Sequence, residues 1–143
     1  MLPSTTIRPS LHPIHAILLS FPVAFFAAAL FSDISFLNSA EVQWSNFSQW
    51  AITGALVLGA PVVIWAVVAR LRSHVSGLRS RPSIYLALVS GMWLLGLINA
   101  LKHSQDAWSS VGTAGVLLSI LCTALAFAAA WIAHSTIAPG EKA

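Results

Sequence analysis

Charged side chains are scarce in this sequence, since Asp, Glu, Lys and Arg together make up 8% of its 143 residues. Soluble domains contain about 25% charged residues, so an ordinary water-soluble globular domain is excluded. Cysteine is also nearly missing, because Cys122 is the single one and can form no disulfide within the chain. A disulfide-rich secreted scaffold and a zinc site built on several thiolates are therefore excluded as well.

A concentrated basic surface for nucleic acid is lacking too. The chain has seven Lys and Arg against four Asp and Glu, and the basic residues are scattered between apolar stretches. Nucleic-acid-binding domains instead cluster them on one face or along one helix. Glycine-rich phosphate-binding motifs and a His-Glu-x-x-His zinc helix are absent from the sequence. We therefore expect neither a nucleic-acid partner nor a nucleotide.

Long apolar runs dominate the chain instead. Four of them contain no Asp, Glu, Lys or Arg, and they cover residues 9–32, 42–69, 82–101 and 107–140. Each can supply the ~20 apolar residues with which a helix crosses ~30 Å of hydrocarbon. An alternative for the first run is a cleavable signal peptide, but a single basic residue precedes it and Phe31-Ser32-Asp33 is a poor cleavage site.

The sequence thus predicts an all-α fold, an integral membrane four-helix bundle that forms one domain over residues 1–143. The transmembrane helices are expected near residues 13–36, 48–71, 82–102 and 111–134. A basic loop over residues 72–81 joins the second predicted helix to the third. The lipid bilayer is the expected environment of the bundle.

The basic residues predict the orientation of the bundle. With four spans, both chain ends and the middle loop share one side of the membrane, which then holds Arg8, Arg70, Arg72, Arg79, Arg81 and Lys142. Lys102 alone falls on the other side. Because cytoplasmic loops carry the excess of Lys and Arg, we expect both termini and the loop of residues 72–81 to be cytoplasmic. The predicted location is the bacterial inner (plasma) membrane.

Small residues at four-residue spacing predict how the helices pack. Close approach at small side chains drives helix association in lipid. The predicted contact stripes are Ala51, Ala55 and Gly59 on the second helix, Ala87 and Gly91 in line with Asn99 on the third, and Gly115, Ser119 and Thr123 followed by Ala126 and Ala130 on the fourth.

Polar residues at the outer ends of the predicted helices form a candidate cluster of Asp33, Asn99, His103 and Asp106. An ionisable residue within a membrane segment is a functional hypothesis by default. The competing interpretation is that these side chains are end groups solvated by water and lipid headgroups, and their position at helix ends favours it. His103, Ser104 and Asp106 also have the residue types of a hydrolase triad, but adjacency in sequence is no evidence for triad geometry. We do not expect an enzyme.

Histidines at the cytoplasmic ends of the helices are candidate cofactor ligands, namely His12, His15 and His134. A four-helix bundle can hold haem iron between two imidazoles from different helices at the same depth. The predicted pair is His15 with His134, because His103 lies on the opposite side. The same histidines can instead bind a divalent metal or relay protons. We expect no bound cofactor, with haem b as the alternative.

Several motifs resemble the bacterial membrane-protein family called domain of unknown function 2231. They span the chain from His12 to about Trp131, and comprise His12-Pro13-Ile14-His15, Phe21-Pro22, Asp33, the run from Trp44 to Trp50, Gly54, Gly59, Asn99, the segment from His103 to Trp108, Gly115 and Ser119. The resemblance implies the architecture of a membrane protein and no particular reaction.

The sequence departs from the family pattern at three places. The family's acid at the end of the second helix is replaced by Val67-Val68-Ala69-Arg70, and its histidine near the start of the third by Pro82-Ser83-Ile84-Tyr85. Its glycine-rich, histidine-containing tail is replaced by Ala133-His134-Ser135. If the family's polar residues form a cofactor site, this chain lacks part of it.

The sequence therefore favours a small multi-pass protein of unknown activity that serves as a structural or accessory partner. It would act on another membrane protein or assemble as a homo-oligomer. The alternative is a b-type haem-binding membrane redox protein.

Overall fold

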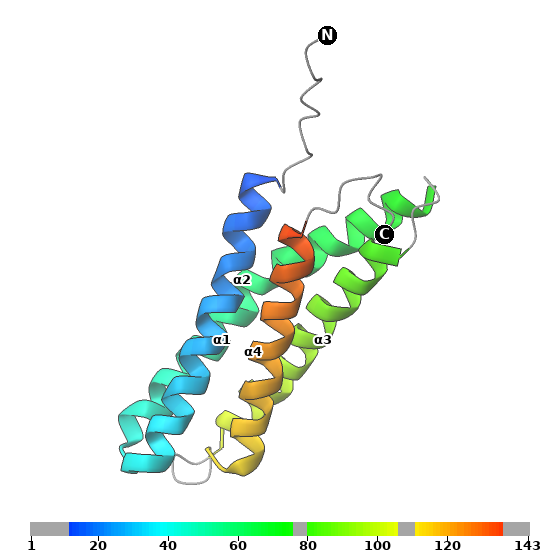
Figure 1. Ribbon diagram of the computed structural model, residues 1–143. Helices are drawn as coiled ribbons and strands as arrows, with labels where there is room; N and C mark the ends of the chain where they lie inside the picture. Colours follow the sequence, from blue (N-terminus) through cyan, green and yellow to red (C-terminus); the bar gives the residue numbers. More distant parts are fainter. Residues whose placement is uncertain (1–11, 76–79, 106–110, 136–143) are drawn as a thin grey trace, which may run out of the picture.

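The computed structural model describes residues 12–75, 80–105 and 111–135, and within these ranges it contains four α-helices and no strand. The helices run alternately in opposite directions and form a four-helix bundle (Figure 1). They are α1 (Pro13–Ser39), α2 (Val42–Val75), α3 (Ser80–His103) and α4 (Thr113–His134). Each is long and apolar enough to cross a membrane. The predicted all-α membrane bundle is confirmed.

Neighbouring helices pack around a square. α1 contacts α2 and α4, and α3 also contacts α2 and α4, whereas α1 and α3 face each other across the diagonal. Because successive helices alternate in direction, α1 and α3 run parallel (Figure 1). The start of α1, the end of α2, the start of α3 and the end of α4 therefore lie at one end of the bundle. The end of α1, the start of α2, the end of α3 and the start of α4 lie at the other end.

The helices extend beyond several predicted boundaries. α1 continues to Ser39 instead of residue 36, and α2 runs from Val42 to Val75 instead of 48–71. The predicted boundaries depend on charged residues, which mark where a helix leaves the hydrocarbon core of the membrane. They do not mark where the backbone hydrogen bonding of the helix ends. α1 ends at Ala40, whose left-handed backbone (φ 55°) directs its N–H to the carbonyl of Phe36. The predicted loop of residues 72–81 is shorter, because its first four residues belong to α2 and its last two to α3.

The apolar side chains of the interior form two clusters. Phe26, Ile52 and Met92 lie in the cluster nearer the α1–α2 connection, and Leu19 and Val62 in the other. Small residues permit this packing, as predicted for the second and fourth helices, where Ala51, Ala55, Gly59, Gly115, Ser119, Thr123 and Ala126 are buried and Ala130 is half-buried.

The predicted stripe on the third helix is wrong at Ala87, which is exposed, while Gly91 is half-buried. The buried line of α3 follows Val89, Met92, Gly96, Asn99 and His103 instead. Its alternating steps of three and four residues keep it on one helix face, which a strict spacing of four does not.

Candidate functional site

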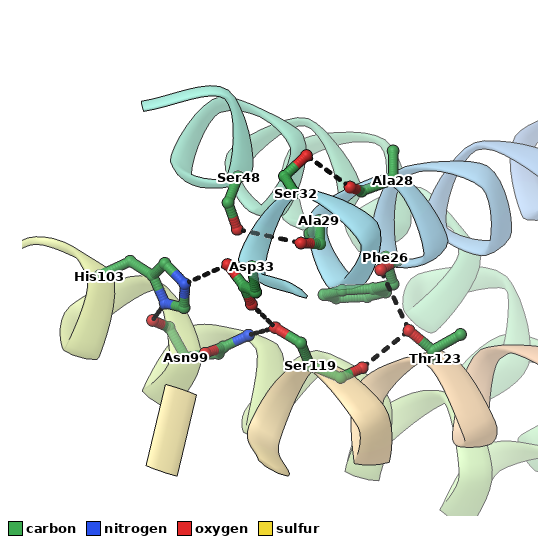
Figure 2. A network of polar contacts seen from close by, with 10 residues as sticks. All are labelled: Phe26, Ala28, Ala29, Ser32, Asp33, Ser48, Asn99, His103, Ser119 and Thr123. Atoms are coloured by element: carbon green, nitrogen blue, oxygen red, sulfur yellow. Dashed lines mark hydrogen bonds and ion pairs between the residues drawn. The ribbon is translucent and has the colours of Figure 1, made fainter. Parts of the chain in front are cut away.

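A cluster of polar side chains lies inside the bundle near its α1–α2 end (Figure 2). Asp33 comes from α1, Asn99 and His103 from α3, and Ser119 from α4. All four side chains are 0% exposed. We call these four residues the polar cluster. The structure brings together three of the four residues expected at this end, and the fourth, Asp106, lies outside the described residues.

The extra length of α1 explains why Asp33 is enclosed. The helix continues for six residues beyond Asp33, a rise of about 9 Å, so the carboxyl group lies inside the bundle and not at its rim. Asn99 and His103 are one turn apart on α3 and face the same way. Asp33, Asn99 and His103 are therefore not end groups solvated by water or headgroups.

Asp33 and His103 connect the two helices that face each other across the diagonal. The Oδ1 atom of Asp33 lies 2.9 Å from the Nε2 atom of His103. The other ring nitrogen of His103, Nδ1, lies 3.0 Å from the carbonyl oxygen of Asn99. A carbonyl oxygen only accepts hydrogen bonds, so Nδ1 carries a proton and donates it to this carbonyl.

The hydrogen bond between Oδ1 of Asp33 and Nε2 of His103 contains one further proton. Either an imidazolium donates from Nε2 to a carboxylate, or a protonated carboxyl donates to Nε2 of a neutral ring. Both arrangements contain the same number of protons and have no net charge. Such a pair is compatible with full burial, whereas an isolated charge in a membrane interior costs several kcal/mol.

Ser119 and Asn99 complete the hydrogen bonding of the carboxyl group. The Ser119 hydroxyl donates to Oδ2 of Asp33 at 2.5 Å, and its oxygen accepts a hydrogen bond from Nδ2 of Asn99 at 2.9 Å. The direction of the chain from Asn99 through Ser119 to Asp33 is fixed, because the amide nitrogen only donates. The Oδ1 atom of Asn99 is buried and has no hydrogen-bond partner.

The polar cluster has the residue types of a hydrolase triad but not its connectivity. In such a triad the histidine lies between the serine and the aspartate and takes the serine proton. Here Asp33 lies in the middle, and the Ser119 proton points to the carboxyl group, not to His103. This arrangement does not activate the serine as a nucleophile.

Hydroxyl groups next to the polar cluster join α2 and α4 to the backbone of α1 by further hydrogen bonds (Figure 2). The hydroxyl group of Thr123 on α4 lies between the carbonyl oxygens of Phe26 (3.0 Å) and Ser119 (2.7 Å), which share its single proton. Ser48 of α2 donates to the carbonyl oxygen of Ala29 at 3.4 Å. Together with the polar cluster, these bonds join all four helices at this end of the bundle.

A second polar pair joins α1 and α3 at the opposite end. Nε2 of His15 lies 2.7 Å from the hydroxyl oxygen of Tyr85, and the ring of His15 also packs against Trp65, with 5.1 Å between centroids. His15 is buried, and its Nδ1 atom has no hydrogen-bond partner. The two helices that face each other across the diagonal are thus linked by one polar side-chain contact near each end.

The other predicted cofactor ligands are exposed. His134, the last residue of α4, turns Nδ1 toward the carbonyl oxygen of Ala130 on its own helix, at 2.8 Å. His12 precedes α1 and its ring lies 5.4 Å from that of Trp65. Among the described residues, no three His, Cys, Asp or Glu side chains come together in a way that could hold a metal ion.

Two residues of these sites were not predicted as site residues. Ser119 belonged to the small-residue stripe of the fourth helix, and its role as a hydrogen-bond link emerges only when α4 is placed against Asp33. From the sequence, Tyr85 is only part of a departure from the family pattern. A polar residue on an otherwise apolar helix is the signal in both cases, but it does not reveal the partner on another helix.

The fold and the cluster define the class of this molecule: it is a multi-pass membrane protein, a bundle of four apolar helices with polar side chains paired in its interior. A family model described as "Predicted membrane protein (DUF2231)" matches residues 11–135. The chain belongs to this family, as the resemblance of its motifs indicated. No curated protein and no solved structure matches the chain.

Proposed function

We propose that this protein is a structural or accessory partner in the membrane and acts through contacts of its outer surface. The observation that supports this role is the closure of the polar cluster, whose four side chains are 0% exposed. Catalysis on an organic substrate needs a cleft that leads to the reacting groups. The surface that the described helices offer to other molecules is largely apolar, with polar side chains toward the two ends of the bundle.

The location that we propose is the bacterial inner membrane, with both chain ends in the cytoplasm. Six of the seven Lys and Arg residues flank one end of the bundle in the sequence, which supports this orientation through the positive-inside rule.

In this proposal the polar cluster gives the partner surface a constant shape. Apolar helices slide past one another at little cost in lipid, since the surrounding tails are as apolar as the helix faces. The hydrogen bonds that join Asp33 to His103 of α3 and Ser119 of α4 hold these three helices in one register. The cluster is then a positioning device, and the residues that contact a partner lie on the outside.

Crosslinking inside living membranes tests this proposal. A photoreactive amino acid replaces one exposed residue on each helix, Phe31 (69% exposed), Trp50 (72%), Leu101 (64%) or Trp131 (76%). Ile52, which is 0% exposed, is the buried control. We expect at least one exposed position to give a protein adduct of defined mass and Ile52 to give none. Lipid adducts alone at all four exposed positions would contradict a partner role.

The mass of an adduct identifies the kind of partner. A crosslink to a second copy of the chain identifies a homo-oligomer, and one to a different chain identifies a heterologous partner. In either case the helix that carries the reactive position gives the side of the bundle on which the partner lies.

A haem-binding redox protein is the second candidate, supported by the unpartnered, buried Nδ1 atom of His15. The surroundings fit a haem poorly. Nε2 of His15 is hydrogen-bonded to the hydroxyl group of Tyr85, Trp65 packs against the imidazole ring of His15, and His134 is exposed. An axial haem ligand at His15 would require these neighbours to move.

A further inference from the structure

A groove runs along the outer face of α2 in its second half. It is lined by Pro61, Ile64, Trp65, Val68, Ala69 and Arg72 and has a volume of about 520 Å³. These positions recur at steps of three and four residues, so they form one helix face. The buried residues Val62 and Ala66 point the other way, into the core. The groove therefore opens toward whatever surrounds the bundle.

The ends of the groove differ in chemistry. Five of its six lining residues are apolar, and the sixth, Arg72, is exposed and is the last residue of the candidate membrane span Val42–Arg72. The apolar part thus lies at the depth of lipid tails, with the guanidinium group at the membrane surface.

The length of the groove matches one leaflet. From Pro61 to Arg72 the helix rises by about 17 Å over eleven residues, and half of a ~30 Å hydrocarbon core is about 15 Å. A chain that follows the groove therefore runs from the membrane surface to the midplane.

Basic residues predominate in the sequence around this end of α2. Arg70 and Arg72 lie on the last turns of α2, and four more of the seven Lys and Arg residues flank these helix ends in the sequence. Of the four acidic residues, Glu141 alone belongs to this side of the sequence. A guanidinium group offers paired N–H donors that match the oxygens of a phosphate.

We propose that this groove is a binding site for one anionic phospholipid, with an acyl chain along Pro61, Trp65 and Val68 and the phosphate at Arg72. A basic group above an apolar, leaflet-deep groove is complementary to both parts of such a lipid. The site involves neither the polar cluster nor the partner role proposed above.

Native mass spectrometry of the full chain in detergent tests this site, with phosphatidylglycerol and phosphatidylcholine of identical acyl chains as probes. We expect the wild type to retain phosphatidylglycerol in preference to phosphatidylcholine. Arg72→Gln should weaken the retention of phosphatidylglycerol about fivefold, the equivalent of ~1 kcal/mol for one basic residue at an anionic surface, and leave phosphatidylcholine unchanged. Lys102→Gln is the matched control, since it removes a positive charge at the opposite end.

A second variant tests the place of the acyl chain. Ala69→Phe fills the groove and should reduce the retention of both lipids, whereas Ala87→Phe, on an exposed face of α3, should reduce neither. Equal effects of Arg72→Gln and Lys102→Gln, or no effect of Ala69→Phe, would overturn the proposal. Displacement of the lipid by inorganic phosphate alone would also overturn the proposal, because it would assign the groove to a free anion. A dimer that Ala69→Phe dissociates would overturn it as well, because it would assign the groove to a second copy of the chain.

Discussion

Asp33 and His103 are 70 residues apart in the sequence, yet their Oδ1 and Nε2 atoms lie 2.9 Å apart across the diagonal of the bundle. The backbones of α1 and α3 do not pack against each other. Side chains alone span this diagonal, at Asp33 and His103 near one end and at His15 and Tyr85 near the other. The four adjacent helix pairs pack directly against each other, whereas α1 and α3 lie further apart and are joined by these two hydrogen-bonded contacts, which therefore fix the position of α1 relative to α3.

Substitution of Asp33 by Asn should destabilise the bundle without a change of side-chain size. The new amide can accept the Ser119 hydroxyl with its oxygen and donate one N–H to Nε2 of His103, but its second N–H has no counterpart in the hydrogen bonds that the carboxyl group makes. A buried donor without a partner costs about 1–3 kcal/mol. We expect the free energy of unfolding, measured by titration with a denaturing detergent, to fall by this amount.

Controls separate the pair from a general effect of substitution. Ser35→Ala removes only an exposed hydrogen bond to the carbonyl of Phe31 and should change stability by less than about 0.5 kcal/mol. The double variant Asp33→Leu with His103→Leu should lose less than the sum of the two single variants, because no buried polar partner is left behind. Strict additivity would show that the pair does not interact energetically.

The sequence predicts the helices that carry this site but not the burial of Asp33. Charge-free runs predict the four helices because an ionised group in hydrocarbon is costly. The same rule misplaces Asp33, since it treats a charged residue as the end of a span. Asp33 remains inside because His103 and Ser119 satisfy its oxygens, and that compensation depends on two residues of other helices.

Packing at glycines gives a second case in which sequence and structure differ. Gly59 belongs to a regular stripe of small residues, and the structure leaves room there, since an added Cβ would meet its nearest neighbour, Cδ1 of Trp93, at 3.6 Å. Gly96 lies in none of the predicted stripes, yet a Cβ there would lie 2.7 Å from Cζ of Phe26 and 3.1 Å from Cδ2 of Leu56. The spacing of small residues therefore predicts a contact face but not the tightest contact.

Gly96→Ala should accordingly be more harmful than Gly59→Ala. The new methyl group must displace Phe26, which is fully buried in the core, and overpacking of this kind costs about 1–3 kcal/mol. Gly59→Ala should change the free energy of unfolding by less than about 0.5 kcal/mol, because the added atom makes only ordinary van der Waals contacts. Equal melting temperatures of the two variants in detergent would contradict the packing around Gly96.

The orientation in the membrane is tested by reporter fusions. Because six of the seven Lys and Arg residues belong to one side, fusions after Ser76 and at the carboxyl terminus should report the cytoplasm. A fusion after Gln43, at the start of α2, should report the outer compartment. Replacing Arg70, Arg72, Arg79 and Arg81 by Gln should weaken this preference, whereas Lys102→Gln should strengthen it. A cytoplasmic signal from the fusion at Gln43 would contradict the orientation.

The visible spectrum of the purified protein decides between the two candidate functions. We expect no Soret band, because Nε2 of His15 is hydrogen-bonded to the hydroxyl group of Tyr85 and the ring of His15 packs against Trp65. His15→Ala should then affect stability alone, by about the 0.6 kcal/mol that interhelical hydrogen bonds in membrane proteins average. A Soret band that disappears in His15→Ala and in His134→Ala, but persists in His103→Ala at the other end of the bundle, would instead establish a haem held by the two histidines. Tyr85→Phe provides the remaining comparison, because it removes the hydroxyl group that is hydrogen-bonded to Nε2 of His15. If haem binds at His15, this variant should strengthen the Soret band. If no haem binds, the variant should reproduce the small loss of stability of His15→Ala.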